Sequence, residues 1–388
     1  MSAAASSIPH HAPAVAGLTL PRRLEFGSGC IETAVADLAS DATPRLLVTS
    51  RQTQHLAEAI LRGVGHVHPI VVADREPTFT MLDEALLQAR KHHVAGVIAV
   101  GGGSVLDLAK VVCVLLDRSL TLDAILGIDR VPHRRAGLIC IPTTSGTGSE
   151  VSPNALLVDE RDHAKKAVIS QHIVPDAAYV DPNLTLGCPA GVTASSGIDA
   201  MVHGIEAYAN KLAHPLVDPL ALEAVRLTSR SVVRAVKNGS DLAARTDMSL
   251  GSLLAGMCLG PVNTGAVHAL AYPLGTMFGI SHGLSNAILL THVLRFNLPA
   301  SPARYARIAC QMDVADAGDD RATASTGLDH LATLVARCGI PARLRDIGVT
   351  EASIPAMAAQ ALTIRRLLDR NVREVTLDDA IHIYREAF

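Results

Sequence analysis

The sequence predicts a two-part fold, with an α/β domain built on a parallel sheet followed by an all-helical domain. Short apolar runs alternate with amphipathic stretches up to about residue 182. Beyond about residue 184, helical stretches rich in Ala, Leu and Arg dominate, and no alternation of the β type stands out. Continuous apolar strands separated by helices are typical of a parallel sheet covered on both faces. We therefore expect an α/β domain over 18–184 and a helical domain over 185–388.

Composition limits the class of protein. The chain has 388 residues, of which 49% are hydrophobic, so a large core is available. Aromatic residues make up only 3% and Trp is absent, so aliphatic side chains must fill that core. A net charge of −3 removes the usual reason to expect a nucleic acid or an anionic membrane as partner. No apolar run reaches the roughly 18 residues that a membrane span needs. Neither a nucleic acid nor a membrane is therefore expected as partner.

Cysteine usage predicts a reducing compartment. The seven cysteines occur singly, without a CxxC pair. This pattern indicates the cytoplasm and argues against a disulfide framework or a thiolate zinc site. Residues 1–17 hold small residues and Pro, without a basic start followed by an apolar stretch. We interpret them as a flexible N-terminal lead and not as a signal peptide.

Four apolar runs predict strands in the N-terminal half, and amphipathic stretches between them predict helices. The runs span Leu46–Thr49, Ile70–Val72, His93–Val100 and Gly137–Pro142. The predicted helices lie near Ile31–Leu38 and over Met81–Lys91 and Val105–Leu116. This alternation is the pattern on which the parallel sheet is predicted.

A glycine-rich turn follows the third predicted strand directly and opens a helix. It reads Gly101-Gly102-Gly103-Ser104. Glycines let backbone amides approach a diphosphate closely, and the helix N-terminus favours negative charge. A plain tight turn needs only one or two glycines, so the sequence favours phosphate binding. The GxGxxG fingerprint is absent, so spacing alone does not separate NAD(P) from another phosphate ligand.

A second loop of small and hydroxylated residues follows the fourth predicted strand. Residues 142–150 read PTTSGTGSE. Their hydroxyls can bond a phosphate, a ribose or an amide, and a solvated loop is the alternative. Because nine such residues follow a buried strand, they indicate the wall of a site.

The C-terminal half is predicted to be a helical bundle. Its clearest helical stretches are Pro219–Val236, Asp241–Met257 and Gly283–Phe296. Thr193, Ser195 and Ser196 are candidate N-caps for a helix that carries residues 199 and 203. We expect Pro261 and Pro273 to interrupt helices, and a helix to start near His282. The arginines near the C-terminus, namely Arg365, Arg366, Arg370 and Arg373, are interpreted as a solvated face.

The strongest chemical signal lies between residues 197 and 286. Asp199 and His203 are four residues apart, which puts both side chains on one face of a helix. His268 and His282 lie fourteen residues apart in two short Gly-rich segments. One carboxylate and three imidazoles can hold a divalent cation. With 17 histidines in the chain, pairs at helical spacing also arise by chance, so spacing alone leaves a packing role open for each.

Five segments, taken together and in this order, resemble the iron-containing (group III) alcohol dehydrogenase family. They are GGGSVLDLAK (101–110), PTTSGTGSEVSP (142–153), VDP (180–182), GIDAMVHGIEAY (197–208) and GAVHALAYPLGTMFGISHGLSNA (265–287). The resemblance runs from about Leu20 to the C-terminal helices. It implies a Rossmann-like N-terminal domain that binds NAD or NADP, a helical metal-binding domain, and a dehydroquinate synthase-like architecture. It also implies a homo-oligomer, a dimer or larger.

The resemblance assigns site residues by position. Metal ligands map onto Asp199, His203, His268 and His282, with Fe²⁺ usual and Zn²⁺ sometimes found. The diphosphate loop maps onto Gly102, Gly103 and Ser104. Further cofactor contacts map onto Thr143, Thr144, Thr147, Ser152 and one of Lys165 and Lys166. Asp107 matches the Asp of the glycine motif and is expected to face the nicotinamide ribose.

Two positions depart from the family pattern. Tyr272 stands where members often have a further His beside the substrate. A phenol can hydrogen-bond a substrate oxygen, but its ordinary pKa near 10 makes it a poor base at pH 7, and simple packing is the alternative. Ser50 stands where NAD-preferring members often have Asp. Loss of that carboxylate removes repulsion of a 2′-phosphate, which Arg51 can contact, so NADP is allowed and NAD is not excluded.

The resemblance implies reversible hydride transfer between an alcohol and NAD(P)⁺, with the metal as Lewis acid on the substrate oxygen. Three other reactions stay open: a maleylacetate reductase-type reduction, a lyase reaction of the dehydroquinate synthase type, and a metal-assisted hydrolysis. Asp199 and the loop at 142–150 are of the dehydrogenase type, not the maleylacetate reductase type. Hydrolysis would leave the glycine turn unexplained.

Overall fold

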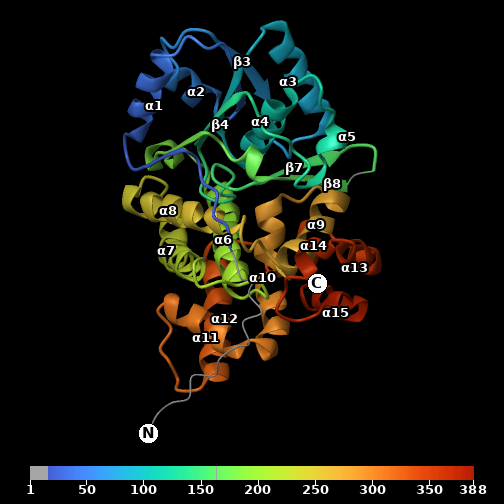
Figure 1. The fold of residues 1–388 in the computed structure, drawn as a ribbon. Coiled ribbons are helices and arrows are strands. Elements are labelled where there is room, and N and C mark those ends of the chain that lie inside the picture. Colours follow the sequence, from blue (N-terminus) through green and yellow to red (C-terminus); the bar gives the residue numbers. More distant parts are fainter. Residues whose placement is uncertain (1–15, 163) are drawn as a thin grey trace.

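The structure, a computed structural model, describes residues 16–162 and 164–388, so most of the predicted lead at 1–17 lies outside the described residues. Within them an α/β half precedes a helical half, and the two are stacked end to end (Figure 1). Six strands form one sheet in the order β1-β9-β6-β4-β2-β3, and every neighbouring pair is parallel. The predicted fold class is confirmed.

The four predicted strands form the interior and one edge of this sheet. The six strands are β1 (Arg23–Phe26), β2 (Arg45–Ser50), β3 (Val67–Val72), β4 (Gly96–Gly101), β6 (Gly137–Pro142) and β9 (Ala177–Val180). β1 and β9 were not predicted. Each has only four residues, and β1 lies at the sheet edge beside β9. Segments this short carry too little pattern to be recognised.

Helices cover both faces of the sheet. In this half they are α1 (Cys30–Ala39), α2 (Gln54–Ile60), α3 (Phe79–Lys91), α4 (Gly103–Leu115) and the short α5 (Leu122–Ile125). Leu47 and Ile98 pack with residues of α1 and α2, whereas Val48 and Ala99 pack with α3 and α4. Successive side chains of a strand point to opposite faces, so a strand buried on both faces is apolar throughout.

A small second sheet extends from the α/β half. It holds β5 (Gly127–Ile128), β7 (Asn154–Asp159) and β8 (Ala164–Ile169), in the order β5-β8-β7. β7 and β8 form an antiparallel hairpin, and β8 contacts helix α9 of the helical half. The hairpin was not predicted. Residues of both β7 and β8 line the cleft next to α9.

The helical half contains ten α-helices among the described residues. They are α6 (Ala190–Tyr208), α7 (Asp218–Lys237), α8 (Leu242–Cys258), α9 (Ala266–Phe278), α10 (His282–Asn297), α11 (Pro302–Gln311), α12 (Asp320–Arg337), α13 (Ile354–Leu362), α14 (Arg365–Leu368) and α15 (Leu377–Glu386). Short 3₁₀ turns lie within this half at Leu298–Ala300, Leu344–Ile347 and Glu351–Ser353. Two further 3₁₀ turns precede α6, at Gln171–Ile173 and Pro182–Thr185. The three predicted helical stretches agree with α7, α8 and α10 to within one residue at each end.

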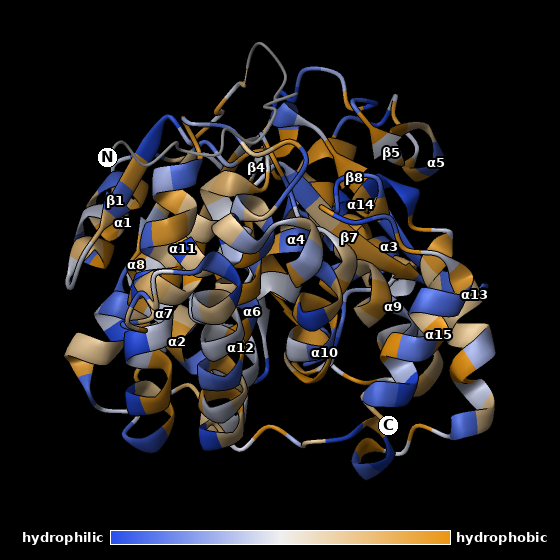
Figure 2. Ribbon diagram, turned by 90° about the horizontal axis from the view of Figure 1, so that it is seen from below, coloured by the Kyte–Doolittle hydropathy of each residue, from blue (hydrophilic) through white to orange (hydrophobic). Residues whose placement is uncertain are grey.

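Helix α6 is the centre of the helical half. Its side chains join the largest apolar cluster, which also includes residues of α9, α10 and α12. In Figure 2 hydrophilic residues gather on outer turns and loops, while the inner helices are mostly hydrophobic. A Cβ on Gly204 would meet the carbonyl oxygen of Ala221 at 2.9 Å, and one on Gly197 would meet Met248 Cε at 2.7 Å. These glycines therefore let α7 and α8 lie close against α6. No helix among the described residues is long and apolar enough to cross a bilayer.

Two local predictions are wrong. Helix α6 begins at Ala190, so the predicted caps Thr193, Ser195 and Ser196 lie inside it. Their hydroxyls bond carbonyls about one turn earlier; that of Ser196, for example, donates to Val192 O at 2.7 Å. This is the alternative pairing open to a hydroxyl within a helix.

Pro273 does not interrupt its helix. It lies inside α9, although a proline there lacks the N–H that would bond the carbonyl one turn earlier. The surrounding residues of α9 are fully or almost fully buried against neighbouring helices. Tertiary packing therefore holds the helix through a position that local propensity disfavours.

Candidate active site

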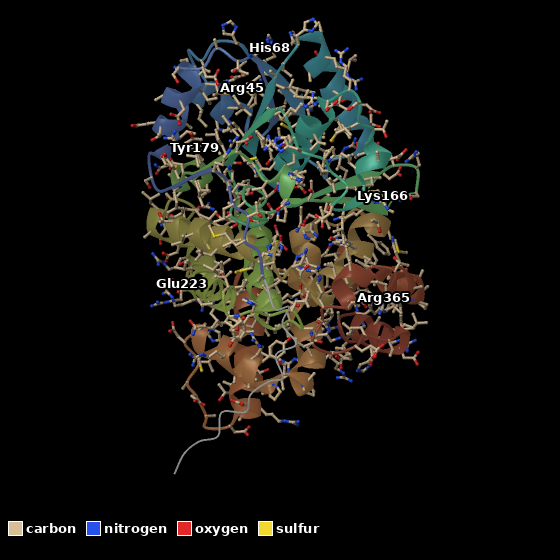
Figure 3. The ribbon with its side chains drawn as sticks, viewed as in Figure 1. Arg45, His68, Lys166, Tyr179, Glu223 and Arg365 are labelled. Carbon is tan, nitrogen blue, oxygen red and sulfur yellow. The ribbon has the colours of Figure 1, made fainter. Side chains whose placement is uncertain are left out.

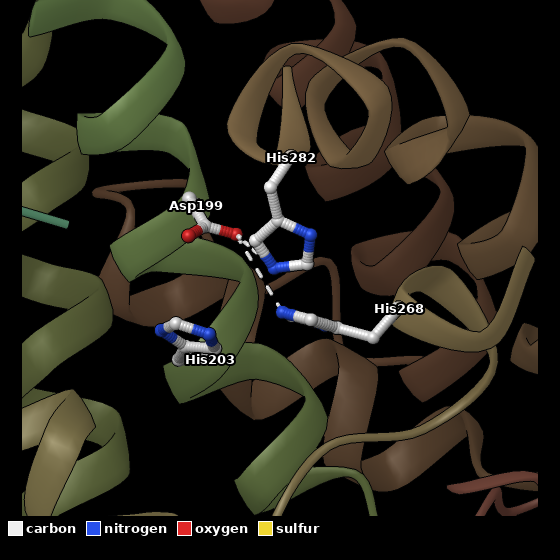
Figure 4. A group of neighbouring side chains, drawn as sticks. All are labelled: Asp199, His203, His268 and His282. Carbon is white, nitrogen blue, oxygen red and sulfur yellow. Dashed lines mark ion pairs between the residues drawn. The ribbon is translucent and has the colours of Figure 1, made fainter. Parts of the chain in front are cut away.

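Asp199, His203, His268 and His282 come together at one point (Figure 4). One ligand atom from each lies within 4.8 Å of the others. Asp199 and His203 lie one turn apart on α6, His268 is in the first turn of α9, and His282 opens α10. We call these four residues the cation cluster. Three helices, far apart in the sequence, are needed to assemble it.

The separations fit donors arranged around a common centre. His268 Nε2 lies 3.5 Å from Asp199 Oδ1, and His282 Nε2 lies 3.8 Å from the same oxygen. Both distances exceed the usual 2.7–3.2 Å of an N–H···O hydrogen bond. The rings of His203 and His268 are stacked with centroids 4.7 Å apart. Ligands of one small cation show this kind of spacing.

A buried carboxylate fixes how His268 faces the cluster. Glu206 Oε2 lies 2.6 Å from His268 Nδ1, and Glu206 Oε1 accepts from the backbone N–H of Val267 at 2.6 Å. The other ring nitrogen, Nε2, is buried and has no hydrogen-bond partner among the described residues. An imidazole held at one nitrogen by a carboxylate, with the other aimed at acidic and imidazole donors, fits a bound metal ion. The residues present therefore fit the implied divalent cation.

Sequence reasoning missed two polar partners of the cluster. Glu206 follows His203 by three residues on α6, and Asn286 follows His282 by four on α10. Asn286 Nδ2 donates to Asp199 Oδ1 at 2.6 Å. Their helical spacing from a candidate ligand was the one signal available in the sequence.

Burial and neighbouring charges set different protonation states within the cluster. Burial lowers the pKa of His203 to about 4 and holds the pKa of His282 well below its ordinary value. Burial acts in the same direction on His268. The carboxylates of Asp199 and Glu206 outweigh it, however, and raise the pKa of His268 to about 10. Neutral imidazoles bind metals, so His268 must release a proton when a cation binds.

One cleft connects the cation cluster with the glycine turn. Its lining includes Gly103, Ser104 and Thr147 as well as all four cluster residues. Gly102 is the N-cap of α4, and Gly103 is the first residue of that helix. The free N–H groups that begin a helix therefore lie at this turn, where they attract a phosphate.

The two predicted loops close on each other. A Cβ on Gly103 would meet Thr147 Cγ2 at 2.4 Å, and one on Gly102 would meet Thr144 Oγ1 at 3.2 Å. Glycine at 103 is thus required for the close approach of the second loop. Thr143 is buried and its hydroxyl has no partner among the described residues, while the carbonyl of Ser152 accepts from Lys110 Nζ at 2.8 Å.

Asp107 lines the cleft, but its carboxylate is already engaged. Oδ1 accepts from Ser149 Oγ at 2.5 Å and Oδ2 from the backbone N–H of Leu156 at 3.0 Å. These bonds tie the second loop and β7 to α4. Burial raises the pKa of this carboxyl. Asp107 therefore braces the second loop and β7, and its expected contact with the ribose stays a prediction.

Alternation along β8 separates the two candidate lysines. Lys165 has 4% of its side chain exposed, lines the cleft, and places Nζ 2.6 Å from Glu76 Oε1. Lys166 points outward at the hairpin, pairs with Asp162, and is labelled in Figure 3. Ser50 ends β2, next to the strand that leads into the glycine turn. Its hydroxyl lies 3.1 Å from Thr53 Oγ1, and it is outside the lining of the cleft.

Tyr272 borders the cluster, and an arginine holds its hydroxyl. The Tyr272 and His282 ring centroids are 5.9 Å apart. Tyr272 Oη accepts from Arg366 Nη2 at 2.6 Å. The interpretation of the C-terminal arginines as a solvated face is wrong for Arg366, because α14 places it in the cleft lining beside α9. Arg370 and Arg373 are only partly exposed and donate to backbone carbonyls, whereas Arg365 is exposed.

A glycine-rich turn from strand to helix that shares one cleft with an Asp/His cation cluster is typical of one class, the metal-dependent dinucleotide oxidoreductases. The profile described as "Iron-containing alcohol dehydrogenase" matches residues 21–182, and that of the "Fe-containing alcohol dehydrogenase family, C-terminal" matches 193–388. The chain belongs to the iron-containing alcohol dehydrogenase family. The predicted enzyme class, an oxidoreductase acting on alcohols or aldehydes, is confirmed.

Individual relatives agree with this assignment over most of their length. The chain is 37% identical over 352 residues to a 1,3-propanediol dehydrogenase of Citrobacter freundii. This alignment covers 88% of this chain and 91% of the relative. A crystal structure of a 1,3-propanediol oxidoreductase superposes with a TM-score of 0.91 at 32% identity, over 96% of this chain and 100% of that one. The structure of a sulfoacetaldehyde reductase of Bifidobacterium kashiwanohense, solved with NAD⁺, superposes with a TM-score of 0.85 at 27% identity. The superposition covers 96% of this chain and 98% of that one.

Proposed function

We propose that this protein interconverts a short alcohol and its aldehyde, with NAD(H) as hydride partner and Fe²⁺ held by Asp199, His203, His268 and His282. The observation that carries the proposal is the cation cluster, with its unpartnered His268 Nε2, in the same cleft as the glycine turn. The family descriptions name iron, which supports Fe²⁺ over Zn²⁺. A divalent cation bound there supplies Lewis-acid polarisation of the substrate oxygen.

His282 is the most exposed member of the cation cluster, and we place substrate entry on its side, which we call the open side. The side chain of His282 is 21% exposed, whereas those of Asp199 and His268 are 2% and 4% exposed. Tyr272 borders this side, because its ring centroid lies 5.9 Å from that of His282. Because Tyr272 Oη accepts its bond from Arg366, its own O–H is free to donate to a substrate oxygen. We assign Tyr272 the role of orienting the substrate and not that of a base.

The cofactor half of the site follows from the two loops. Gly102, Gly103 and Ser104 offer the helix N-terminus for the diphosphate, and Thr147, Ser152 and Lys165 line the cleft. Thr144 lies against Gly102 outside the cleft lining, and we keep it and its neighbour Thr143 as proposed cofactor contacts of the same loop. The nicotinamide cofactor supplies the hydride acceptor or donor. Ser50 brings no carboxylate to the end of β2, so we propose that NADP(H) is tolerated beside NAD(H).

We also propose the domain division at about residue 184, a homo-oligomeric state and a cytoplasmic location. The last strand of the sheet ends at Val180 and the first long helix begins at Ala190, which supports the division. All seven cysteines are free thiols, which supports a reducing compartment.

The decisive experiment is the His268→Ala variant, with His330→Ala on the exposed side of α12 as control. Both proteins are purified and loaded with Fe²⁺ anaerobically. Bound metal is then measured, and NADH oxidation with propanal is followed at 340 nm. His268→Ala is expected to lose metal and activity together, while His330→Ala keeps both. A folded, metal-free His268→Ala protein with full activity contradicts the assignment.

A further inference from the structure

Tyr272 lies between two cationic side chains next to the open side of the cation cluster. Arg366 binds its hydroxyl at 2.6 Å, and the guanidinium carbon lies 5.7 Å from the ring centroid. Lys165 Nζ lies 5.2 Å from the same centroid. All three side chains line the cleft together with His282. This end of the cleft therefore offers more positive charge than an alcohol group alone requires.

The two cations differ in whether their charge is balanced. Lys165 is paired with Glu76 at 2.6 Å. No carboxylate oxygen of residues 16–162 or 164–388 lies within 4.0 Å of the Arg366 guanidinium, and its neighbour Arg365 instead pairs with Asp369. Residues 1–15 contain no Asp or Glu. Arg370 is a second guanidinium nearby. Burial lowers its pKa, and the charge of Arg366 lowers it further. The positive charge at Arg366 is thus uncompensated.

The donors of Arg366 are also largely unused. A guanidinium carries five N–H donors in a planar fork, and the side-chain bond seen here, to Tyr272 Oη, engages one of them. Arg366 is half-buried, so part of its solvation is already lost and an incoming anion is attracted more strongly than at an open surface. A planar fork of this kind binds a carboxylate through two parallel hydrogen bonds.

We propose that the substrate of this enzyme is an anionic alcohol or aldehyde, whose acidic group is bound by Arg366 while its reacting oxygen lies at the cation cluster. This inference rests on the proposed function. A carboxylate is the acidic group that best fits the fork, and Arg366 is the specificity-determining residue. A brace that only holds Tyr272 would explain the hydroxyl bond, but it would leave the unbalanced charge without a role.

The test compares two aldehydes of nearly equal shape that differ in charge, 4-oxobutanoate and its methyl ester. The Fe²⁺-loaded enzyme is assayed anaerobically with NADH as wild type, Arg366→Gln, Arg366→Lys and Arg365→Gln. The readout is the ratio of kcat/KM for the anion to kcat/KM for the ester. We expect a ratio of about ten or more for the wild type, and at least about a tenfold fall in Arg366→Gln, mainly through KM. Arg366→Lys should retain part of the ratio, and Arg365→Gln all of it.

Binding is measured separately from turnover. Calorimetric titration of 4-hydroxybutanoate into the enzyme–NADH complex should give a Kd about tenfold weaker or more in Arg366→Gln. The Kd of NADH should be the same in both proteins. A wild-type preference for the ester, an unchanged ratio in Arg366→Gln, or a change in NADH affinity instead of the ratio would overturn the inference.

The outcomes also separate the inference from the proposed function. If the ester is reduced and the ratio does not depend on Arg366, the result supports the proposed reaction and contradicts the anion site. If neither aldehyde is reduced but 4-hydroxybutanoate binding depends on Arg366, the result supports the anion site and contradicts the proposed reaction. If neither turnover nor binding is seen, both are wrong.

Discussion

The orientation of one imidazole shows how a metal site depends on residues that never touch the metal. His268 has two ring nitrogens, and the hydrogen bond that Nδ1–H donates to Glu206 directs Nε2 toward Asp199. Glu206 is itself held by the backbone N–H of Val267, which belongs to the same helix as His268. The two helices α6 and α9 are therefore joined by the carboxylate next to the cation cluster.

Replacement of Glu206 by Gln should weaken metal binding. An amide is a poorer acceptor than a carboxylate, and it leaves the His268 ring less basic and less firmly oriented. The loss expected for such a partner is about 10- to 100-fold in metal affinity. Competition with a chelator of known affinity measures it. Glu223→Gln, which removes a partly exposed carboxylate of α7 far from the cation cluster, is the matched control (Figure 3). Equal metal affinities in the two variants would contradict the role given to Glu206.

The residues found by sequence reasoning and those missed differ in the kind of information they need. Asp199, His203, His268 and His282 stand in motifs that are visible along the chain. Arg366 was misinterpreted because a charged residue near the C-terminus looks solvated until α14 is placed against α9. Its role depends on a contact 94 residues away, which no local pattern reports.

At the scale of elements, glycine positions decide how closely loops and helices approach. The glycine turn and the second loop lie against each other only because no side chain stands at residue 103. Helix α6 shows the same dependence at Gly204, whose missing Cβ makes room for α7.

Gly103→Ala should close the cofactor site. The new methyl group would lie 2.4 Å from Thr147 Cγ2, so the second loop must move away from the start of α4. We expect NADH affinity to fall at least about tenfold, because a backbone approach to the diphosphate is lost. Fluorescence of bound NADH measures this. Gly187→Ala, at a position with no heavy atom within 4 Å, should bind NADH like the wild type. Unchanged affinity in Gly103→Ala would show that the turn does not hold the diphosphate.

Gly204→Ala should destabilise the helical half. Its Cβ would lie 2.9 Å from the carbonyl oxygen of Ala221, which is backbone and cannot rotate away. Overpacking of this kind costs about 1–3 kcal/mol. Gly191→Ala in the first turn of the same helix meets no atom within 4 Å and should be neutral or stabilising by up to about 1 kcal/mol. Thermal unfolding of the two variants side by side gives the comparison, and equal melting temperatures would disagree with it.

The predictability of the elements follows their length and burial. The long helices α7, α8 and α10 and the buried strands β2, β4 and β6 were predicted close to their observed bounds. The hairpin was missed because its strands are only half-buried and one of them carries two lysines. The start of α6 was misplaced because its observed N-cap is Pro189, which has no side-chain hydrogen bond to offer.

At the scale of the whole molecule, Glu150 lies where the two halves meet. It lines a small cavity together with Asp181 of the α/β half and Ser249 and Ser252 of α8. Burial raises the pKa of Glu150 to about 7, although Lys110 acts in the opposite direction. The joint between the halves therefore contains an acid that is protonated over part of the neutral range.

The contribution of Glu150 to stability should consequently fall as the pH rises from about 4.5 to about 7. In this window the unfolded chain has released the Glu150 proton while the folded chain still holds it, so raising the pH favours unfolding. Glu150→Gln removes this effect, which amounts to up to about 3 kcal/mol. The variant should gain melting temperature over the wild type at pH 8 but not at pH 4.5. Glu84→Gln, an exposed change on α3, should gain at neither. A gain for Glu150→Gln that is the same at both pH values would exclude this origin.

The hairpin of β7 and β8 belongs to one half of the molecule but reaches the other. Through it Lys165, whose chain neighbours lie in the α/β half, rests 5.2 Å from the ring of Tyr272 on α9. A movement of this hairpin away from α9 would lengthen this separation. The distance between the ammonium and the phenol ring therefore reports how closely the hairpin and α9 approach each other at the reacting end of the cleft.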